Sequence, residues 1–178
     1  LHDAAWEAQW RHHQDDNQGE ATLGDALAAQ RHVKRTGKPV EPRLELFFEG
    51  RPMPLSRWPN EGFTHIDKAL GETSFAVRGL PGRREGVFSC VDDRVKRWVN
   101  EKDALVRGYW FRDWVVQTHR IESIDPEQRI ITLAKPYHNS RGYRDGMWFF
   151  GLNLLCEIDS PGEWMIDREK GLLYFWPP

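Results

Sequence analysis

Two carboxylates stand in surroundings that favour chemistry. Asp113 lies between Trp110 and Trp114, and Glu157 follows an apolar turn at 154–156. Carboxyl groups with shifted pKa values occur in such settings. Glycoside hydrolases use two carboxyl groups that lie about 5–10 Å apart. The competing interpretation is a carboxylate that accepts hydrogen bonds from a backbone amide or an indole, and this interpretation is favoured. We therefore predict no catalytic residue.

Other catalytic and metal-binding patterns are missing. The sequence has no Gly-x-Ser-x-Gly elbow, no Gly-rich phosphate loop before a helix and no His-Glu-x-x-His. Adjacent His12 and His13 diverge on a helix, so solvated helix faces explain the N-terminal histidines better than a zinc site does. Cys90 and Cys156 match no metal or redox spacing and are predicted to be buried free thiols. No metal and no cofactor is expected. The N-terminal histidines are His2, His12, His13 and His32.

Aromatic side chains are abundant: nine Trp, nine Phe and four Tyr. Such rings fill a β core or form a platform on which sugars stack, and the run at 109–114 suits either role. Its favoured interpretation is a strand buried on both faces. Four rings beside Gly- or Arg-rich turns are the candidate carbohydrate contacts: Trp110, Trp114, Tyr143 and Trp148.

Two helices are expected to lead into the domain. Trp6 and Trp10 have the spacing of an amphipathic helix over Asp3–His13, and Thr22 is placed to cap a second helix that reaches about Val33. Residues 1–40 thus form a helical lead-in. We predict that they belong to one domain, 1–178, with a β-rich part at 41–178.

From Arg43 the apolar period changes to two, and breakers separate the runs at short intervals. The predicted fold is all-β: an antiparallel β-sandwich of the jelly-roll kind or a barrel, with a few short helices mainly near the N-terminus and less than a third of the residues helical. Turn signals include Glu49-Gly50 and Leu80-Pro81-Gly82, and Pro52 indicates an edge strand. Strands are expected at Leu44–Phe48, Met53–Trp58, Phe63–Ile66, Ser74–Arg78, Val87–Cys90, Ala104–Trp110, Val115–Ile124, Arg129–Leu133 and Met147–Phe150, and short helices at Asp92–Val99 and Leu152–Ile158.

The segment 162–178 predicts a hairpin. Trp164 and Ile166 share one face of its first arm, and Leu172, Tyr174 and Trp176 share one face of the second. We expect this hairpin to belong to the core.

Arg57 and Trp58 precede the breaker run Pro-Asn-Glu-Gly. A planar guanidinium beside an indole suits a structural lock, in which Arg57 pairs with a carboxylate or with carbonyls and Trp58 closes the core. Asn60 completes this structural motif.

The charges exclude some partners. Lys and Arg (25) nearly balance Asp and Glu (27), so the net charge of −2 gives no global field that attracts nucleic acid or an anionic membrane. No apolar run approaches the roughly 20 residues that span a bilayer, and the first residues lack the basic region of a signal peptide.

A long set of motifs resembles the domain inserted into right-handed parallel β-helix glycoside hydrolases of the family 120 kind. The similarity covers about Leu44 to Pro178, and the first 40 residues match only loosely. The motifs, in order, are LFFEGRPMPLSRWPNEG (46–62), GYW (108–110), ID (124–125), ITL (131–133), PYH (136–138), LN (152–153), GEW (162–164), DR (167–168), Gly171 and LYF (173–175).

This resemblance implies a β module that interrupts a β-helix in an exported, periplasmic or extracellular enzyme acting on plant or algal polysaccharide. The family's catalytic carboxylates lie on the β-helix, so this chain would be a non-catalytic accessory domain that packs against it and walls the sugar cleft. Two alternatives stay open. One is a stand-alone carbohydrate-binding module with exposed coplanar rings, and the other is a small glycoside hydrolase with its own carboxylate pair.

Overall fold

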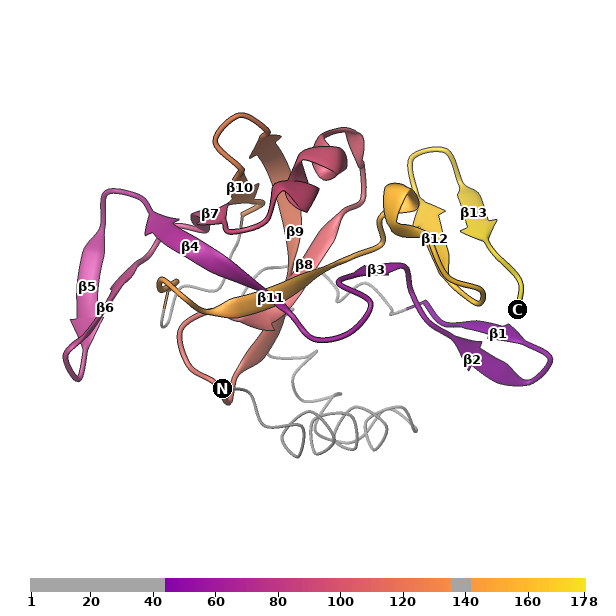
Figure 1. Ribbon diagram of the computed structural model, residues 1–178, viewed down its shortest axis with the longest axis horizontal. Coiled ribbons are helices and arrows are strands. Elements are labelled where there is room, and N and C mark those ends of the chain that lie inside the picture. The colour runs from indigo at the N-terminus through magenta and orange to yellow at the C-terminus, as the bar shows by residue number, and fades with distance from the viewer. Residues whose placement is uncertain (1–43, 136–141) are drawn as a thin grey trace, which may run out of the picture. The chain divides into compact units, whose positions relative to one another are not determined.

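The computed structural model describes residues 44–135 and 142–178 (Figure 1). The chain divides into two compact units, Leu1–Glu45 and Leu46–Pro178, and every strand and helix of the described residues belongs to the second unit. The two helices expected before Val33, and all four N-terminal histidines, lie outside the described residues.

Six antiparallel strands of the second unit close into a barrel. Around the ring the order is β11, β4, β7, β10, β9, β8 and back to β11. The prediction of an all-β antiparallel fold is confirmed, and of its two forms the central sheet is the barrel. The strands are β4 (Thr64–Leu70), β7 (Val87–Cys90), β8 (Leu105–Tyr109), β9 (Val116–Asp125), β10 (Ile130–Leu133) and β11 (Trp148–Leu152).

Strand β11 closes the ring because it pairs on both sides. Its start pairs with β4, its residues 149–152 pair with β8, and its end pairs with the short β3 (Arg57–Trp58). Two glycines of these strands leave no room for a side chain. A Cβ on Gly108 would lie 2.5 Å from the Cβ of Phe149, and one on Gly151 would lie 2.7 Å from the indole of Trp98. A larger residue at Gly108 would push β8 and β11 apart, whereas one at Gly151 would displace the Trp98 ring.

Aromatic rings fill the barrel. Phe88 has no exposed surface, and the centroid of its ring lies 5.6 Å from that of Trp110, 6.2 Å from that of Tyr143 and 5.2 Å from that of Phe149. Ile131 and Leu133 of β10 are also buried. Inward-facing rings from separate strands thus account for much of the aromatic content, because a small barrel is filled by side chains.

Two hairpins carry turns of the kind that matches the twist of antiparallel strands. Strands β1 (Leu46–Phe48) and β2 (Arg51–Met53) join through Glu49-Gly50, and β5 (Ser74–Val77) and β6 (Leu80–Arg83) join through Arg78-Gly79. All four turn residues have positive φ. Pro52 lies on a strand with one partner, as an edge strand requires.

The prediction of a turn at Leu80-Pro81-Gly82 is wrong, because these residues belong to β6. The turn comes earlier, at Arg78-Gly79, where φ is 51° and 79°. Pro81 is tolerated because β6 pairs with β5 in a two-stranded sheet, so one side of the strand needs no ladder donor.

The C-terminal hairpin forms as predicted from β12 (Trp164–Asp167) and β13 (Leu172–Phe175). Its first arm belongs to the core, since Trp164 and Met165 are buried. Its second arm does not, because Leu172, Leu173 and Trp176 are each about half exposed. The expectation that the hairpin belongs to the core therefore holds for its first arm and is wrong for its second.

Two short 3₁₀ helices follow strands of the barrel, at the places where helical turns were expected. The first is η1 (Asp93–Asn100), which follows β7, and the second is η2 (Leu155–Glu157), which follows β11. Val95 and Trp98 of η1 are buried, so this element covers one end of the barrel. No helix in the described parts is long and apolar enough to cross a membrane.

Candidate functional site

The antiparallel strands give the barrel two distinct ends. Leu105 of β8 pairs with Leu152 of β11 at one end, which η1 covers and which we call the η1 end. Tyr109 and Trp148 lie at the other, where β8 ends and β11 begins. We call that the arginine end, for the arginines that gather there.

Glu157 lies at the η1 end with no exposed surface. Arg94 donates to both of its carboxylate oxygens, from Nε at 3.1 Å to each and from Nη2 at 2.8 Å to Oε2. The indole Nε1 of Trp98 donates to Oε1 at 2.9 Å. A carboxylate saturated in this way holds η1 against η2 and has no face open to a substrate. The structural interpretation of Glu157 is the one its contacts support.

A second buried polar group joins β11 to the C-terminal hairpin. The Nδ2 of Asn153 donates to the carbonyl of Asp103 at 3.0 Å and to that of Ile166 at 3.1 Å, while its Oδ1 accepts from Ile166 N at 3.0 Å. The buried Oγ of Ser56 accepts from Leu154 N at 2.8 Å. Asn153 has a φ of 57°, a conformation that Asn tolerates better than most residues. Sequence reasoning missed this group, and its signal was an Asn directly after an apolar strand.

Asp113 is exposed, in the loop that follows β8 at the arginine end. The five residues of β8 separate the two ends by about 15 Å at roughly 3.3 Å per residue. Asp113 and Glu157 therefore do not form a pair at glycosidase spacing.

The Arg57 lock is present. The Nη2 of Arg57 donates to the carbonyl of Gly62, and its guanidinium lies 3.9 Å from the centroid of the Phe150 ring. Trp58 is half-buried and meets Trp98 edge to face, with centroids 5.8 Å apart. The Nδ2 of Asn60 donates to Asp159 Oδ1 at 2.7 Å. All three motif residues thus make structural contacts.

The four candidate sugar-binding rings do not share one surface. Tyr143 is fully buried, and Trp110 is buried with its Nε1 donating to the carbonyl of Gln117 at 3.1 Å. This differs from the expectation for both rings, because inward-facing rings were needed to fill the barrel. Trp148 is half-buried against Tyr109, at 5.7 Å between centroids. Trp114 is 69% exposed, and it is the ring with a face open to a ligand.

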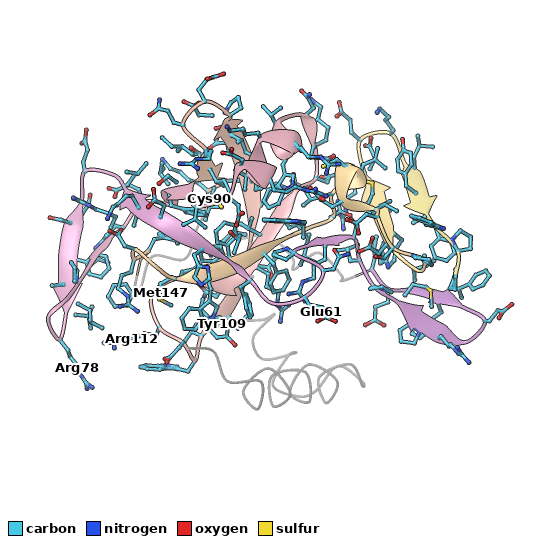
Figure 2. The ribbon with its side chains drawn as sticks, in the orientation of Figure 1. Glu61, Arg78, Cys90, Tyr109, Arg112 and Met147 are labelled. Carbon is cyan, nitrogen blue, oxygen red and sulfur yellow. The ribbon has the colours of Figure 1, made fainter. Side chains whose placement is uncertain are left out.

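Trp114 belongs to a cluster of stacked arginines and rings. The guanidinium of Arg112 lies 5.3 Å from the Trp114 ring and 5.6 Å from the Phe111 ring. Phe111 stacks on Phe75 of β5 at 5.3 Å. The guanidinium of Arg144 also lies over Phe111, at 5.9 Å. Figure 2 shows Arg112 at the end of this unit where the β5–β6 hairpin, tipped by Arg78, projects.

The backbone fixes this arrangement. Arg83 and Tyr143 exchange two backbone hydrogen bonds, at 2.8 and 2.7 Å, and Arg144 N donates to the carbonyl of Trp110 at 2.9 Å. Strand β6, the segment that begins at Gly142 and the end of β8 are therefore neighbours. Sequence reasoning missed the cluster, because its arginines come from three separate segments.

The cysteines and the potential metal ligands of the described parts lie as follows. Both cysteines are free, as predicted, but only Cys90 is buried, whereas Cys156 is half-buried. Burial, together with the neighbouring Glu101 and Glu157 carboxylates, raises the pKa of Cys156 to about 12. Within residues 44–135 and 142–178, no group of three or more His, Cys, Asp or Glu side chains is arranged to hold a metal ion.

Comparison with known proteins shows a structural similarity. No protein-family model matches the chain, and no curated protein matches it. A solved structure described as "Glycoside hydrolase" superposes with a TM-score of 0.58 at 17% sequence identity. The match covers 80% of this chain and 25% of that chain. The similarity shows a shared fold, and this chain spans about a quarter of the length of the solved chain.

Proposed function

We propose that this chain is a non-catalytic accessory domain of a larger carbohydrate-active enzyme, in which it walls one side of the sugar-binding cleft. The observation that carries the proposal is the coverage of the structural match, 80% of this chain against 25% of a glycoside hydrolase. A fold that makes up a quarter of an enzyme suits an inserted or appended module. The finer form of the proposal is the insertion domain of an exported β-helix enzyme of the family 120 kind, with the β-helix domain as its partner.

The state of the carboxylates supports a non-catalytic role. Glycoside hydrolysis needs an acid and a partner carboxylate that both face the sugar. Glu157 is enclosed by Arg94 and Trp98, and Asp113 lies at the other end of the barrel. The catalytic pair of the proposed enzyme is then supplied by its other domain.

Exposed apolar side chains support a protein partner. Phe47 of β1 is 57% exposed, and Leu172, Leu173 and Trp176 are about half exposed on or next to β13. These two hairpins adjoin, since the rings of Phe48 and Phe175 lie 5.5 Å apart. Apolar side chains gathered in this way favour contact with another protein surface, and we place the packing against the β-helix here.

A stand-alone carbohydrate-binding module is the second candidate, and the exposed ring of Trp114 is the observation that favours it. One open ring with neighbouring arginines resembles half of a binding site. Half a site buries too little ligand surface to offset the ordering of sugar and side chains, so the isolated chain should bind neutral sugars weakly.

The test is a panel of aryl glycosides and neutral plant or algal oligosaccharides, assayed with the 178-residue chain for turnover and for a change in tryptophan fluorescence. We expect no turnover and millimolar or absent binding. Turnover that disappears in Asp113→Asn or Glu157→Gln would refute the accessory role. Micromolar binding without turnover would instead favour the stand-alone module.

A further inference from the structure

Positive charge gathers at the arginine end although the chain as a whole carries −2. Arg112 and Arg144 both lie over the Phe111 ring, and Arg84 lies 4.7 Å from the centroid of Phe75, on which Phe111 stacks. Arg83 of β6 and Arg78 at the hairpin tip belong to the same region. We call Arg78, Arg83, Arg84, Arg112 and Arg144 the arginine cluster.

Nearby carboxylates offset part of this charge, since Asp145 interacts electrostatically with Arg83 and the Oε2 atom of Glu85 has no hydrogen-bond partner within the described residues. Asp145 accepts from Lys68 Nζ at 3.0 Å and from Ala69 N at 2.8 Å. Glu85 accepts from Thr73 N at 3.0 Å. Asp113 is exposed in the loop of Arg112, and within the described residues it forms no ion pair with that arginine. The five arginines outnumber Asp113, Asp145 and Glu85, so the arginine cluster keeps a local excess of positive charge.

Two of these arginines have unsatisfied donors. Within the described parts, the Nε atoms of Arg112 and Arg144 are buried and have no hydrogen-bond partner. The Nη2 of Arg144 meets the Sδ of Met147 at 2.9 Å, and sulfur is a weak acceptor. A buried donor without a partner is unfavourable, and because these Nε atoms have almost no exposed surface, an external anion would meet the guanidiniums at their Nη groups.

The surrounding rings hold these guanidiniums in place. Arg112 stacks on two rings and Arg144 on one, so both forks are positioned before a ligand arrives. A fixed guanidinium fork suits a planar carboxylate or a sulfate, which it binds through paired charge-assisted hydrogen bonds. The open Trp114 face beside Arg112 suits the apolar face of a sugar ring.

We infer that the arginine end binds an acidic oligosaccharide, with a carboxylate or sulfate of the sugar at Arg112 and Arg144 and a sugar ring on Trp114. This inference rests on the proposed function and deepens it, because it names the class of sugar that the domain would present to the cleft. Single-stranded nucleic acid also combines anionic groups with stacking rings, so it enters the test as a competitor.

The experiment measures binding to the 178-residue chain by calorimetry at low and high salt. The probes are a uronic-acid tetrasaccharide, a sulfated tetrasaccharide, a neutral tetrasaccharide and a single-stranded oligonucleotide of four phosphates. We expect an acidic tetrasaccharide to bind at least about tenfold more tightly than the neutral one, equivalent to ~1.4 kcal/mol. Salt should weaken the acidic complex, because exposed charges are screened. The two acidic probes distinguish a carboxylate from a sulfate ligand.

Variants locate the site. Arg112→Ala and Arg144→Ala should each weaken acidic binding about tenfold, because each removes a charge-assisted contact. Arg112→Lys should restore part of the loss, since it keeps the charge without the fork. Arg51→Ala is the matched control, an exposed arginine on β2 outside the arginine cluster, and it should change nothing. Trp114→Ala tests the stacking ring without opening the core, and melting curves show whether each variant is folded.

The outcomes separate the two proposals. Equal affinity for neutral and acidic sugars, no binding of acidic sugars, or unchanged affinity in both arginine variants would overturn the inference and leave the accessory role intact. Tighter binding of the oligonucleotide than of either acidic sugar would also overturn it. Turnover of an oligosaccharide by this chain would refute the accessory role instead.

Discussion

Replacing Glu157 by Gln tests whether this carboxylate is structural. The carboxylate accepts hydrogen bonds from three N–H donors, Arg94 Nε and Nη2 and Trp98 Nε1, and from the thiol of Cys156 at 3.7 Å. A glutamine of the same shape has one acceptor oxygen, and its NH₂ group would face N–H donors of Arg94 or Trp98 instead of accepting from them. The substitution also removes the charge that balances Arg94. We therefore expect a substantial loss of stability with little change in side-chain volume.

The magnitude follows from the burial of the two partners. Breaking a fully buried ion pair by removing one partner costs about 3–5 kcal/mol. Arg94 is 34% exposed and also reaches Asp159 at 3.6 Å, so water and that carboxylate compensate part of the loss. We expect Glu157→Gln to lower the free energy of unfolding by about 2–3 kcal/mol. For a chain of this size each kcal/mol lowers the melting temperature by about 2–4 °C.

The assay is urea and thermal unfolding of the wild-type chain and two variants. Glu127→Gln is the matched control, because Glu127 is exposed and its replacement removes the same charge, and it should change stability by less than about 0.5 kcal/mol. If Glu157→Gln were as stable as Glu127→Gln, the bonds from Arg94 and Trp98 would not stabilise the fold. An accompanying loss of hydrolysis would then assign Glu157 to catalysis and refute the reasoning.

Three further predictions concern other contacts of the domain. Trp58→Ala should cost about 2–4 kcal/mol in urea unfolding, because the half-buried ring meets Trp98 edge to face; an unchanged midpoint would show that the ring does not support the core. Cys156 should resist iodoacetamide at pH 8 in the folded chain and react after unfolding, because its pKa is raised to about 12 and the thiolate is the nucleophile; rapid labelling of the folded chain would contradict this. The pKa of Asp167 is lowered, chiefly by the hydrogen bond from the backbone N–H of Lys170. The ionised carboxylate therefore stabilises the folded chain fully above the unfolded pKa of about 3.9. This contribution is lost as the pH falls through the lower pKa of the folded state. Asp167→Asn should therefore flatten the fall in stability below about pH 4 in acid unfolding curves, and an unchanged slope would count against the contact.

Local features of the fold were predictable from the sequence. The period-two runs predicted β7 at Val87–Cys90 without error, and the Glu49-Gly50 turn and the C-terminal hairpin formed where they were expected. Each of these elements is set by residues close together in the chain. The wrong prediction of a turn at Leu80-Pro81-Gly82 also came from local residue types. Proline and glycine are typical of turns, but they also occur in edge strands such as β6.

Features set by distant residues were not predictable. Barrel closure depends on the pairing of β11 with β8, where Gly108 lies against Phe149. A sequence pattern does not show which glycine lies against a neighbouring strand. The same holds for the rings. Trp110 and Trp114 are four residues apart, yet Trp110 faces the core and Trp114 faces solvent, because β8 ends at Tyr109 and Trp114 lies in the loop beyond it. A run of aromatic residues thus predicted an important segment without predicting which ring a ligand could reach.

The distribution of charge links the fold to the proposed role. At the η1 end, Glu157 and Asp103 are buried and are bonded to Arg94 and Arg120, so these carboxylates stabilise the covered end of the barrel. At the arginine end, Arg112 and Arg144 are held by rings and have no carboxylate partner within the described residues. Replacing either arginine should therefore cost little stability compared with replacing Glu157. A domain that stabilises one end with paired charges and leaves these two guanidiniums without a carboxylate at the other is suited to binding an anion at that second end. Of the two candidate carboxylates, Asp113 lies at the arginine end and Glu157 at the η1 end, so the anion-binding end does not hold a pair of them.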